Sequence, residues 1–283
     1  MRHSKTCIII SGPTAVGKTA YSIELAKQLN TSIISADSRQ CYRELNIGVA
    51  KPNPDQLAAV PHFFINTYSI QDEVNVATFE KDALDAVAHI FREKDVAVMV
   101  GGTGLYIRAF CEGLDIVPAA DPDIREKVRA EYEQAGMAWL QSQLKEKDPL
   151  YAAQGEMQNP QRMLRALEVI ISIGRSIISF QQGNTVQRPF NIEHRPMQLP
   201  REELYARINS RVDTMVAEGL LKEAQQLYPY RHLNALQTVG YRELFDHFDG
   251  KMSLADAVAE IKKNTRHYAK RQMTWFNKFI PAN

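Results

Sequence analysis

Residues 6–29 read TCIIISGPTAVGKTAYSIELAKQL, and this stretch decides the fold. The β-branched apolar run Thr6–Ser11 predicts a buried parallel strand. Gly12–Thr19 matches the pattern G-x-x-x-x-G-K-[ST], and the apolar spacing within Ala20–Leu29 predicts a helix. In this context the loop turns backbone N–H groups toward a phosphate, and the helix N-terminus adds partial positive charge. The stretch therefore predicts a P-loop, against the alternative of a chance match in an unrelated loop.

All eight loop positions enter the predicted phosphate site. They are Gly12, Pro13, Thr14, Ala15, Val16, Gly17, Lys18 and Thr19. We expect Lys18 to reach the terminal phosphate and the Thr19 hydroxyl to ligate Mg²⁺. The motif by itself indicates a phosphate, not a nucleotide.

Further strand and helix signals follow the loop. Thr31–Ala36 and Val96–Val100 predict two more strands, and Thr78–Arg92 predicts a helix between them. Strands that alternate with helices imply a parallel sheet with helices on both faces. We expect the Thr31–Ala36 strand to lie next to the P-loop strand. The predicted class is therefore α/β, with a P-loop NTPase-like parallel sheet flanked by helices.

Beyond about Gly113 strand signals vanish and the patterns are helical. The expected helices are Asp121–Gln134, Ala138–Lys145, Pro160–Ile173 and Glu202–Gly219. A polar stretch over 179–200 predicts a linker. We therefore expect a catalytic core of residues 1–114 and 201–283, interrupted by an all-helical insertion of residues 115–200.

Composition limits the class of protein without identifying a partner. The 283 residues carry a net charge of +1, so any nucleic-acid interface must come from local clusters of charge. The three cysteines form no CxxC pair, which indicates reduced thiols and a cytoplasmic protein. The apolar stretch Cys7–Ile10 is too short for a signal peptide or a membrane span.

Two polar motifs follow the second and third predicted strands. Ligand sites in parallel sheets lie at the carboxyl ends of strands, so Asp37 in Ser35–Gln40 is placed to hold a metal or accept a proton. A helix N-cap is the alternative for Asp37. The third strand runs into Gly101–Tyr106, where many P-loop NTPases carry a metal-binding Asp. Glycines there allow close approach of a ligand, and a tight turn is the alternative.

Two basic segments indicate an RNA partner. Arg162 and Arg165 share a face of the predicted helix Pro160–Ile173, a pattern that suits phosphates or bases and also a solvated surface. From Lys262 onward the chain carries six basic residues and no acidic one. Aromatic residues are interleaved with them, which favours stacking on unpaired bases, although Trp275 and Phe276 suit a hydrophobic core as well.

Together these motifs resemble the bacterial tRNA dimethylallyltransferase (tRNA isopentenyltransferase) family. The matching pieces are GPTAVGKT (12–19), ISADSRQCYRELNIGVAKP (34–52), GGTGLYI (101–107), NPQRMLRALEV (159–169), QTVGYREL (237–244) and NTRHYAKRQMTWF (264–276). They follow the family's order over nearly the whole chain. Two departures are Val16, where Ser or Ala is usual, and Gln237, at a variable place.

The resemblance implies an activity. A dimethylallyl group would pass from dimethylallyl diphosphate to N6 of the adenine 3′ of the anticodon, in tRNAs reading codons that begin with U. The diphosphate would lie on Gly12–Thr19 with Mg²⁺ as cofactor, and the adenine would be flipped into a channel. By match, Asp37 would be the general base, with Lys18 and Thr103 at the same centre. The family also favours a monomer.

The resemblance implies tRNA contacts as well, and the helical insertion would hold the anticodon stem. Arg125 is the weakest of these matches. The implied contacts are Asp37, Ser38, Arg39, Gln40, Thr103, Arg125, Gln161, Arg162, Met163, Leu164, Arg165, Gln237, Thr238, Val239, Gly240, Tyr241, Arg242, Lys270, Arg271, Gln272, Met273, Thr274, Trp275, Phe276 and Asn277.

Two other functions stay open at this point. A small-molecule or nucleotide kinase would use the same P-loop but leaves the basic and aromatic C-terminus unexplained. An RNA-binding P-loop protein without catalysis leaves Asp37 and Thr103 without a chemical role.

Overall fold

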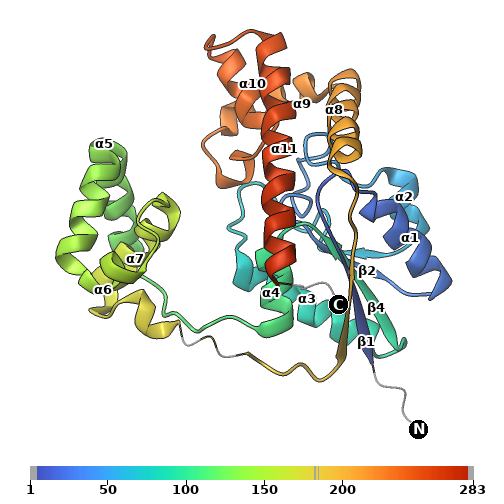
Figure 1. The fold of residues 1–283 in the computed structure, drawn as a ribbon, viewed down its shortest axis with the longest axis horizontal. Helices are drawn as coiled ribbons and strands as arrows, with labels where there is room; N and C mark the ends of the chain where they lie inside the picture. The colour runs from blue at the N-terminus through green and yellow to red at the C-terminus, as the bar shows by residue number, and fades with distance from the viewer. Residues whose placement is uncertain (1–4, 182, 184, 280–283) are drawn as a thin grey trace. The chain divides into compact units, whose positions relative to one another are not determined.

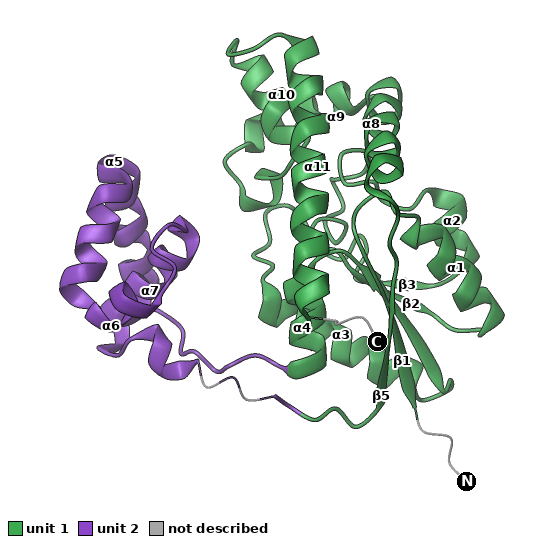
Figure 2. Ribbon diagram, in the orientation of Figure 1, with its two compact units in different colours: residues 1–112, 187–283 green, residues 113–186 purple. Residues whose placement is uncertain are grey.

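The computed structural model describes residues 5–181, 183 and 185–279. The chain forms two compact units, one of residues 1–112 and 187–283 and one of residues 113–186 (Figure 2). The predicted insertion extended to residue 200. The structure instead assigns residues 187–200 to the first unit, because a strand in this segment pairs with the P-loop strand.

The first unit is built on a sheet whose described pairings are all parallel, in the order β3-β2-β4-β1-β5. The strands are β1 (Thr6–Ser11), β2 (Ile33–Ala36), β3 (His62–Phe63), β4 (Val96–Gly101) and β5 (Asn191–Pro196). The three predicted strands are present, and the predicted fold class is confirmed. The expectation that β2 neighbours β1 is wrong, because β4 lies between them.

The sequence does not predict the other two strands of the sheet, β3 and β5. The strand β3 has only two residues, too few for a periodic pattern. The strand β5 lies at the sheet edge and has no fully buried residue, so its sequence NIEHRP lacks the apolar run of a central strand. The sequence instead predicts a polar linker here, and the structure corrects this.

Helices cover both faces of the sheet, as predicted (Figure 1). Along β1, Ile8 and Ile10 pack with α1, whereas Cys7 and Ile9 pack with α3 and α4 on the other face. The α-helices of this unit are α1 (Lys18–Gln28), α2 (Pro54–Ala59), α3 (Val76–Ile90), α4 (Gly104–Glu112), α8 (Arg201–Ala217), α9 (Leu220–Leu227), α10 (Tyr241–Phe248) and α11 (Leu254–Phe279). Short 3₁₀ turns cover Tyr228–Tyr230 and Asn234–Leu236.

The second unit is helical, with α5 (Pro122–Lys147), α6 (Pro149–Gln154), α7 (Pro160–Ile173) and a 3₁₀ turn at Ile177–Phe180. Asp121 caps α5 by accepting hydrogen bonds from the backbone of Asp123 and Ile124. Gly136 interrupts α5 with φ 72° and ψ −163°, between the two helices predicted for this region. The α5 and α7 faces enclose a small core that includes Leu140, Leu144 and Leu167.

The register of the sheet aligns the three motif-bearing strand ends. Gly101 of β4 pairs with Ser11 of β1 on one side and with Ala36 of β2 on the other. The P-loop, Asp37 and the Gly102–Thr103 segment therefore all leave the sheet at one level. A Cβ on Gly101 would lie 2.2 Å from the Ala36 carbonyl oxygen, so only glycine allows this approach.

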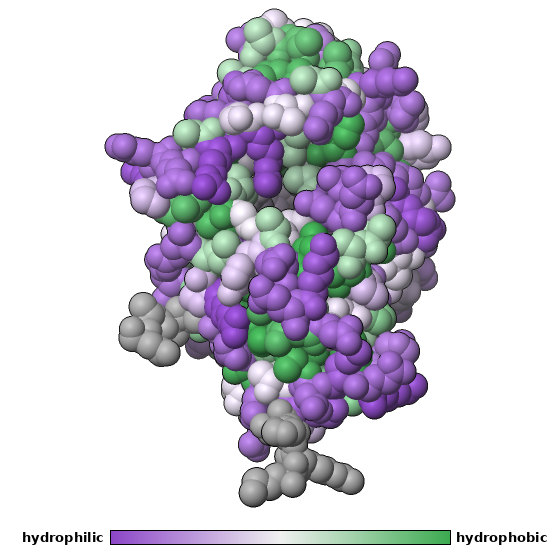
Figure 3. All heavy atoms as spheres, turned by 90° about the vertical axis from the view of Figure 1, so that its right-hand side faces the viewer, coloured by the Kyte–Doolittle hydropathy of each residue, from purple (hydrophilic) through white to green (hydrophobic). Residues whose placement is uncertain are grey.

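The face of the molecule shown in Figure 3 is mostly polar. On this face, hydrophilic side chains dominate and apolar ones are interspersed among them. No helix among the described residues combines the length and apolar character needed to cross a membrane.

Candidate active site

The P-loop connects β1 to α1 in a conformation that requires its glycines. Gly12 has φ 148° and Gly17, the N-cap of α1, has φ 104°. A Cβ on Gly12 would also lie 2.5 Å from the carbonyl oxygen of Met197, just after β5. Ala15 adopts φ 66° despite its side chain. The loop at the carboxyl end of β1 therefore depends on its glycines for this conformation.

Lys18 lies folded against its own loop. Its Nζ donates hydrogen bonds to the carbonyl oxygens of Gly12 at 2.8 Å and Pro13 at 2.6 Å. Burial lowers the pKa of Lys18 to about 7; the nearby Asp37 opposes this shift and Arg211 adds to it. An anionic ligand beside this ammonium would favour its charged form.

Asp37 follows β2 and organises the turn after it. Its Oδ1 accepts hydrogen bonds from the backbone N–H groups of Arg39 at 2.8 Å and Gln40 at 3.2 Å. The alternative prediction for Asp37 was a helix N-cap. Asp37 does accept backbone hydrogen bonds as an N-cap would, but the segment that follows it is a turn and not a helix. Among the described contacts, both backbone N–H groups donate to Oδ1. Oδ2 is therefore the carboxylate oxygen that remains for a ligand.

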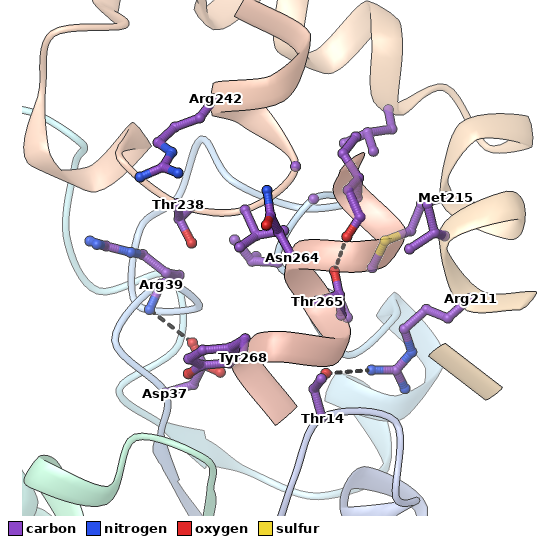
Figure 4. Close-up of a pocket in the computed structure, with 18 of the residues that line it drawn as sticks. Thr14, Asp37, Arg39, Arg211, Met215, Thr238, Arg242, Asn264, Thr265 and Tyr268 are labelled. Carbon is purple, nitrogen blue, oxygen red and sulfur yellow. Dashed lines mark hydrogen bonds between the residues drawn. The ribbon is translucent and has the colours of Figure 1, made fainter. Parts of the chain in front are cut away.

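Thr103 ties the end of β4 to this turn. Its Oγ1 accepts a hydrogen bond from the Ser38 backbone at 3.1 Å, and its own N–H donates to the Ala36 carbonyl at 3.2 Å. The Tyr268 side chain projects from α11, and its burial raises the pKa of the phenol to about 12. Tyr268 therefore stays protonated at neutral pH beside Asp37 (Figure 4).

Two adjoining cavities meet at these groups. The P-loop cavity, about 250 Å³, is lined by Lys18, Thr19, Asp37 and Gly102 among others. The second, which we call the helix cavity, is about 410 Å³ and lies between Asp37 and residues of α8, α10 and α11 (Figure 4). Residues that line both cavities are Thr14, Asp37, Val49, Ala50, Arg211 and Tyr268. Asp37 thus lies where the two cavities join.

Arg211 is a site residue that the sequence analysis missed. It projects from α8, and its guanidinium donates to the Thr14 hydroxyl at 3.3 Å. Burial lowers its pKa, and it adds a second cation to the P-loop cavity beside Lys18. No motif surrounds Arg211, so the sequence carried no signal for it.

Several residues implied to contact tRNA line the helix cavity. They come from the Asp37 turn, the segment before α10 and α11. These are Asp37, Ser38, Arg39, Gln237, Thr238, Val239, Gly240, Arg242 and Arg271. Gln40 and Thr103 lie nearby, and the Gln40 side chain donates to the carbonyl oxygens of Val49 and Ala50.

Five other residues with implied tRNA contacts have buried side chains. Four of them pack into the apolar cores of their own units, whereas Gln272 is buried against the P-loop and borders the P-loop cavity. The five are Met163, Leu164, Tyr241, Gln272 and Phe276. Their burial does not support a side-chain contact with tRNA at these five positions, because alternating burial along a helix turns part of each motif inward.

The remaining residues implied to contact tRNA lie in two places. Arg125 on α5 and Gln161, Arg162 and Arg165 on α7 belong to the helical unit. On α11, Lys270, Thr274 and Asn277 are exposed, whereas Met273 and Trp275 are half-buried against neighbouring side chains.

The basic segment of α11 is less free than its sequence indicates. Lys262 pairs with Asp213 at 2.5 Å, Lys263 pairs with Glu260 at 3.0 Å, and Arg266 donates to Asn209 at 2.6 Å. The predicted basic face of α7 is also partly engaged, because Arg165 donates a hydrogen bond to the Pro118 carbonyl oxygen at 3.1 Å.

Comparison with known proteins gives a consistent family. Residues 40–279 match the family model described as IPP transferase. The chain is 50% identical over 275 residues to the tRNA dimethylallyltransferase of Christiangramia forsetii, which covers 97% of this chain and 91% of that protein. It is 45% identical over 275 residues to the tRNA dimethylallyltransferase of Cytophaga hutchinsonii, covering 97% and 90% of the two chains.

Solved structures agree with the sequence comparisons. The full-length tRNA isopentenylpyrophosphate transferase of Bacillus halodurans superposes with a TM-score of 0.70 at 38% identity, covering 96% of this chain and 87% of that one. A eukaryotic dimethylallyltransferase acting on tRNA superposes with a TM-score of 0.79 at 27% identity, covering 96% and 70%.

Proposed function

The chain belongs to the IPP transferase family, and from this premise we propose that it is a tRNA prenyltransferase. It transfers a dimethylallyl group from dimethylallyl diphosphate to N6 of the adenine on the 3′ side of the anticodon, in tRNAs that read codons beginning with U. The observation that carries the proposal is the position of Asp37, where a cavity lined by the P-loop joins a second cavity large enough for a base.

The P-loop cavity is proposed to hold the donor diphosphate. Lys18 and Arg211 supply two cations, and loop N–H groups supply oriented dipoles. These groups act on the negative charge that grows as the carbon–oxygen bond of the donor breaks. The bonding electrons leave with the diphosphate, so its stabilisation lowers the barrier directly.

The helix cavity is proposed to hold the flipped adenine. N6 is a poor nucleophile because its lone pair is delocalised into the ring. As the new carbon–nitrogen bond forms, Oδ2 of Asp37 accepts a proton from N6, an effect worth about 10²–10⁴-fold in rate. The hydrogen bonds to Oδ1 and the Thr103–Ser38 contact hold this carboxylate in place. Only an unpaired loop base is extruded at low cost.

The site fits Mg²⁺ bound together with the diphosphate. No cluster of three His, Cys, Asp or Glu side chains exists among the described residues, so the protein alone offers no closed metal cage. Mg²⁺ commonly takes one or two protein oxygens and completes its shell with substrate phosphates and water. Thr19 lines the P-loop cavity and would supply such an oxygen. When bound, the ion would neutralise charge on the diphosphate.

The proposed tRNA surface consists of exposed or cavity-lining residues. Arg39, Arg242 and Arg271 reach the helix cavity, and Arg162 is exposed on α7 of the helical unit. Guanidinium groups bind phosphates and stack on bases, which suits an anticodon loop. We further propose that the helical unit holds the anticodon stem, and that the enzyme is a cytoplasmic monomer.

One experiment tests the function. The protein is incubated with Mg²⁺, radiolabelled dimethylallyl diphosphate and undermodified tRNA, and label in the tRNA is measured. We expect transfer that depends on an adenine next to the anticodon, with a matched tRNA carrying guanine at that position as the control. Absence of transfer together with ATP-dependent phosphorylation would support the kinase instead. The family assignment gives that kinase no support.

A further inference from the structure

Gln272 belongs to segment 264–276, for which the sequence predicts RNA binding, but its position in the structure is different from that of an RNA contact. It lies on α11, yet its side chain is only 6% exposed and borders the P-loop cavity. Its Oε1 accepts a hydrogen bond from the Thr14 backbone N–H at 2.9 Å, and its Nε2 donates to the Gly102 carbonyl at 2.9 Å. One side chain therefore joins three elements: α11, the P-loop and the segment after β4.

The two hydrogen bonds constrain the position of the Gln272 amide. A Cβ on Gly102 would lie 2.2 Å from Nε2 of Gln272, so glycine at this position is needed for the amide to reach the carbonyl. The amide also has one orientation that satisfies both partners, because Oε1 must meet a donor and Nε2 an acceptor. A buried amide that lost either partner would leave a backbone group unsatisfied.

We propose that Gln272 is a positioning residue for the prenyl donor and does not contact tRNA. It holds the Thr14 end of the P-loop against the end of β4, so that the diphosphate cradle is already formed before the ligand arrives. This inference rests on the proposed function, since it needs a diphosphate in the P-loop cavity. It predicts that Gln272 controls donor binding while exposed neighbours on α11 control RNA binding.

Binding of inorganic diphosphate with Mg²⁺ is measured by calorimetry, and tRNA binding is measured separately. Gln272→Met keeps the length of the side chain and removes both hydrogen bonds. We expect it to weaken diphosphate binding by about tenfold or more and to raise the KM for dimethylallyl diphosphate, with tRNA affinity within about twofold of the wild type. Gln225→Met, the same change at an exposed glutamine of α9, is the matched control.

Gln272→Glu provides an independent readout if Gln272→Met does not fold. An ionised carboxylate still accepts from Thr14 but cannot donate to Gly102, whereas a protonated carboxyl can do both. Relative to wild type at each pH, the diphosphate affinity of Gln272→Glu should therefore recover as the pH falls.

The outcomes separate the two proposals. Diphosphate affinity that stays within twofold in Gln272→Met, or no recovery at low pH in Gln272→Glu, overturns the positioning role. Weakened tRNA binding with intact diphosphate binding overturns it as well and restores the RNA contact. A wild-type protein that binds no diphosphate overturns the proposed function itself.

Discussion

Replacing Asp37 with Asn separates its two possible roles. Oδ1 accepts the N–H groups of Arg39 at 2.8 Å and Gln40 at 3.2 Å, and an asparagine oxygen can accept both. The turn is therefore kept in Asp37→Asn, but the amide nitrogen that replaces Oδ2 cannot take a proton from N6. We expect single-turnover transfer to fall by about 10²–10⁴-fold, which corresponds to roughly 2.7–5.4 kcal/mol of barrier.

The same variant should fold and bind tRNA normally. Its free energy of unfolding should stay within about 0.5 kcal/mol of wild type, and its tRNA affinity should be unchanged. Asp37→Ala removes the turn contacts as well and should lose about 1 kcal/mol of stability in addition to the activity. Asp85→Asn, at an exposed carboxylate on α3, is the matched control.

The assay is transfer of label from saturating dimethylallyl diphosphate to tRNA, with urea unfolding and filter binding in parallel. If Asp37→Asn transfers the prenyl group within about threefold of the wild-type rate, the carboxylate serves only to cap the turn. The general-base proposal would then be wrong.

Three further predictions concern charge and packing. Burial lowers the pKa of Lys18 to about 7 in the free protein, so diphosphate binding above pH 7 requires proton uptake. Diphosphate affinity measured by calorimetry should therefore fall by up to about tenfold per pH unit from pH 7 to 9. The variant Lys18→Met should lack this pH dependence. Arg162→Ala should weaken tRNA binding and reduce its salt slope by about 1, with unchanged stability; unaltered binding would return this residue to a solvated surface role. Tyr241→Phe removes a hydrogen bond of 2.6 Å to Glu223, so urea unfolding should show a loss of about 1–2 kcal/mol, and an unchanged midpoint would contradict the importance of that bond.

Much of the candidate active site could be predicted from the sequence. The P-loop occupies consecutive residues, and its geometry follows from glycines, a flanking strand and a helix N-terminus. Asp37 and the Gly101–Thr103 segment could be assigned to the site because strands of one parallel sheet end at a common edge. These features depend on local geometry and on alternation of strands and helices, both of which a single sequence displays.

Other features were decided only by tertiary packing. The polar edge strand β5 carries no apolar run, and its partner β1 lies far away in the chain. Arg211 and Gln272 reach the P-loop from α8 and α11 because long-range packing brings those helices over the sheet edge.

The P-loop conformation of residues 12–19 was thus readable from the sequence by itself, since neighbouring residues set it. Which face of a motif is buried is a different matter. Gln272 and exposed Lys270 are two residues apart on one helix, yet one holds the P-loop and the other faces solvent. Tertiary structure decided that division, because the direction of a helical side chain acquires meaning only when another element packs against it.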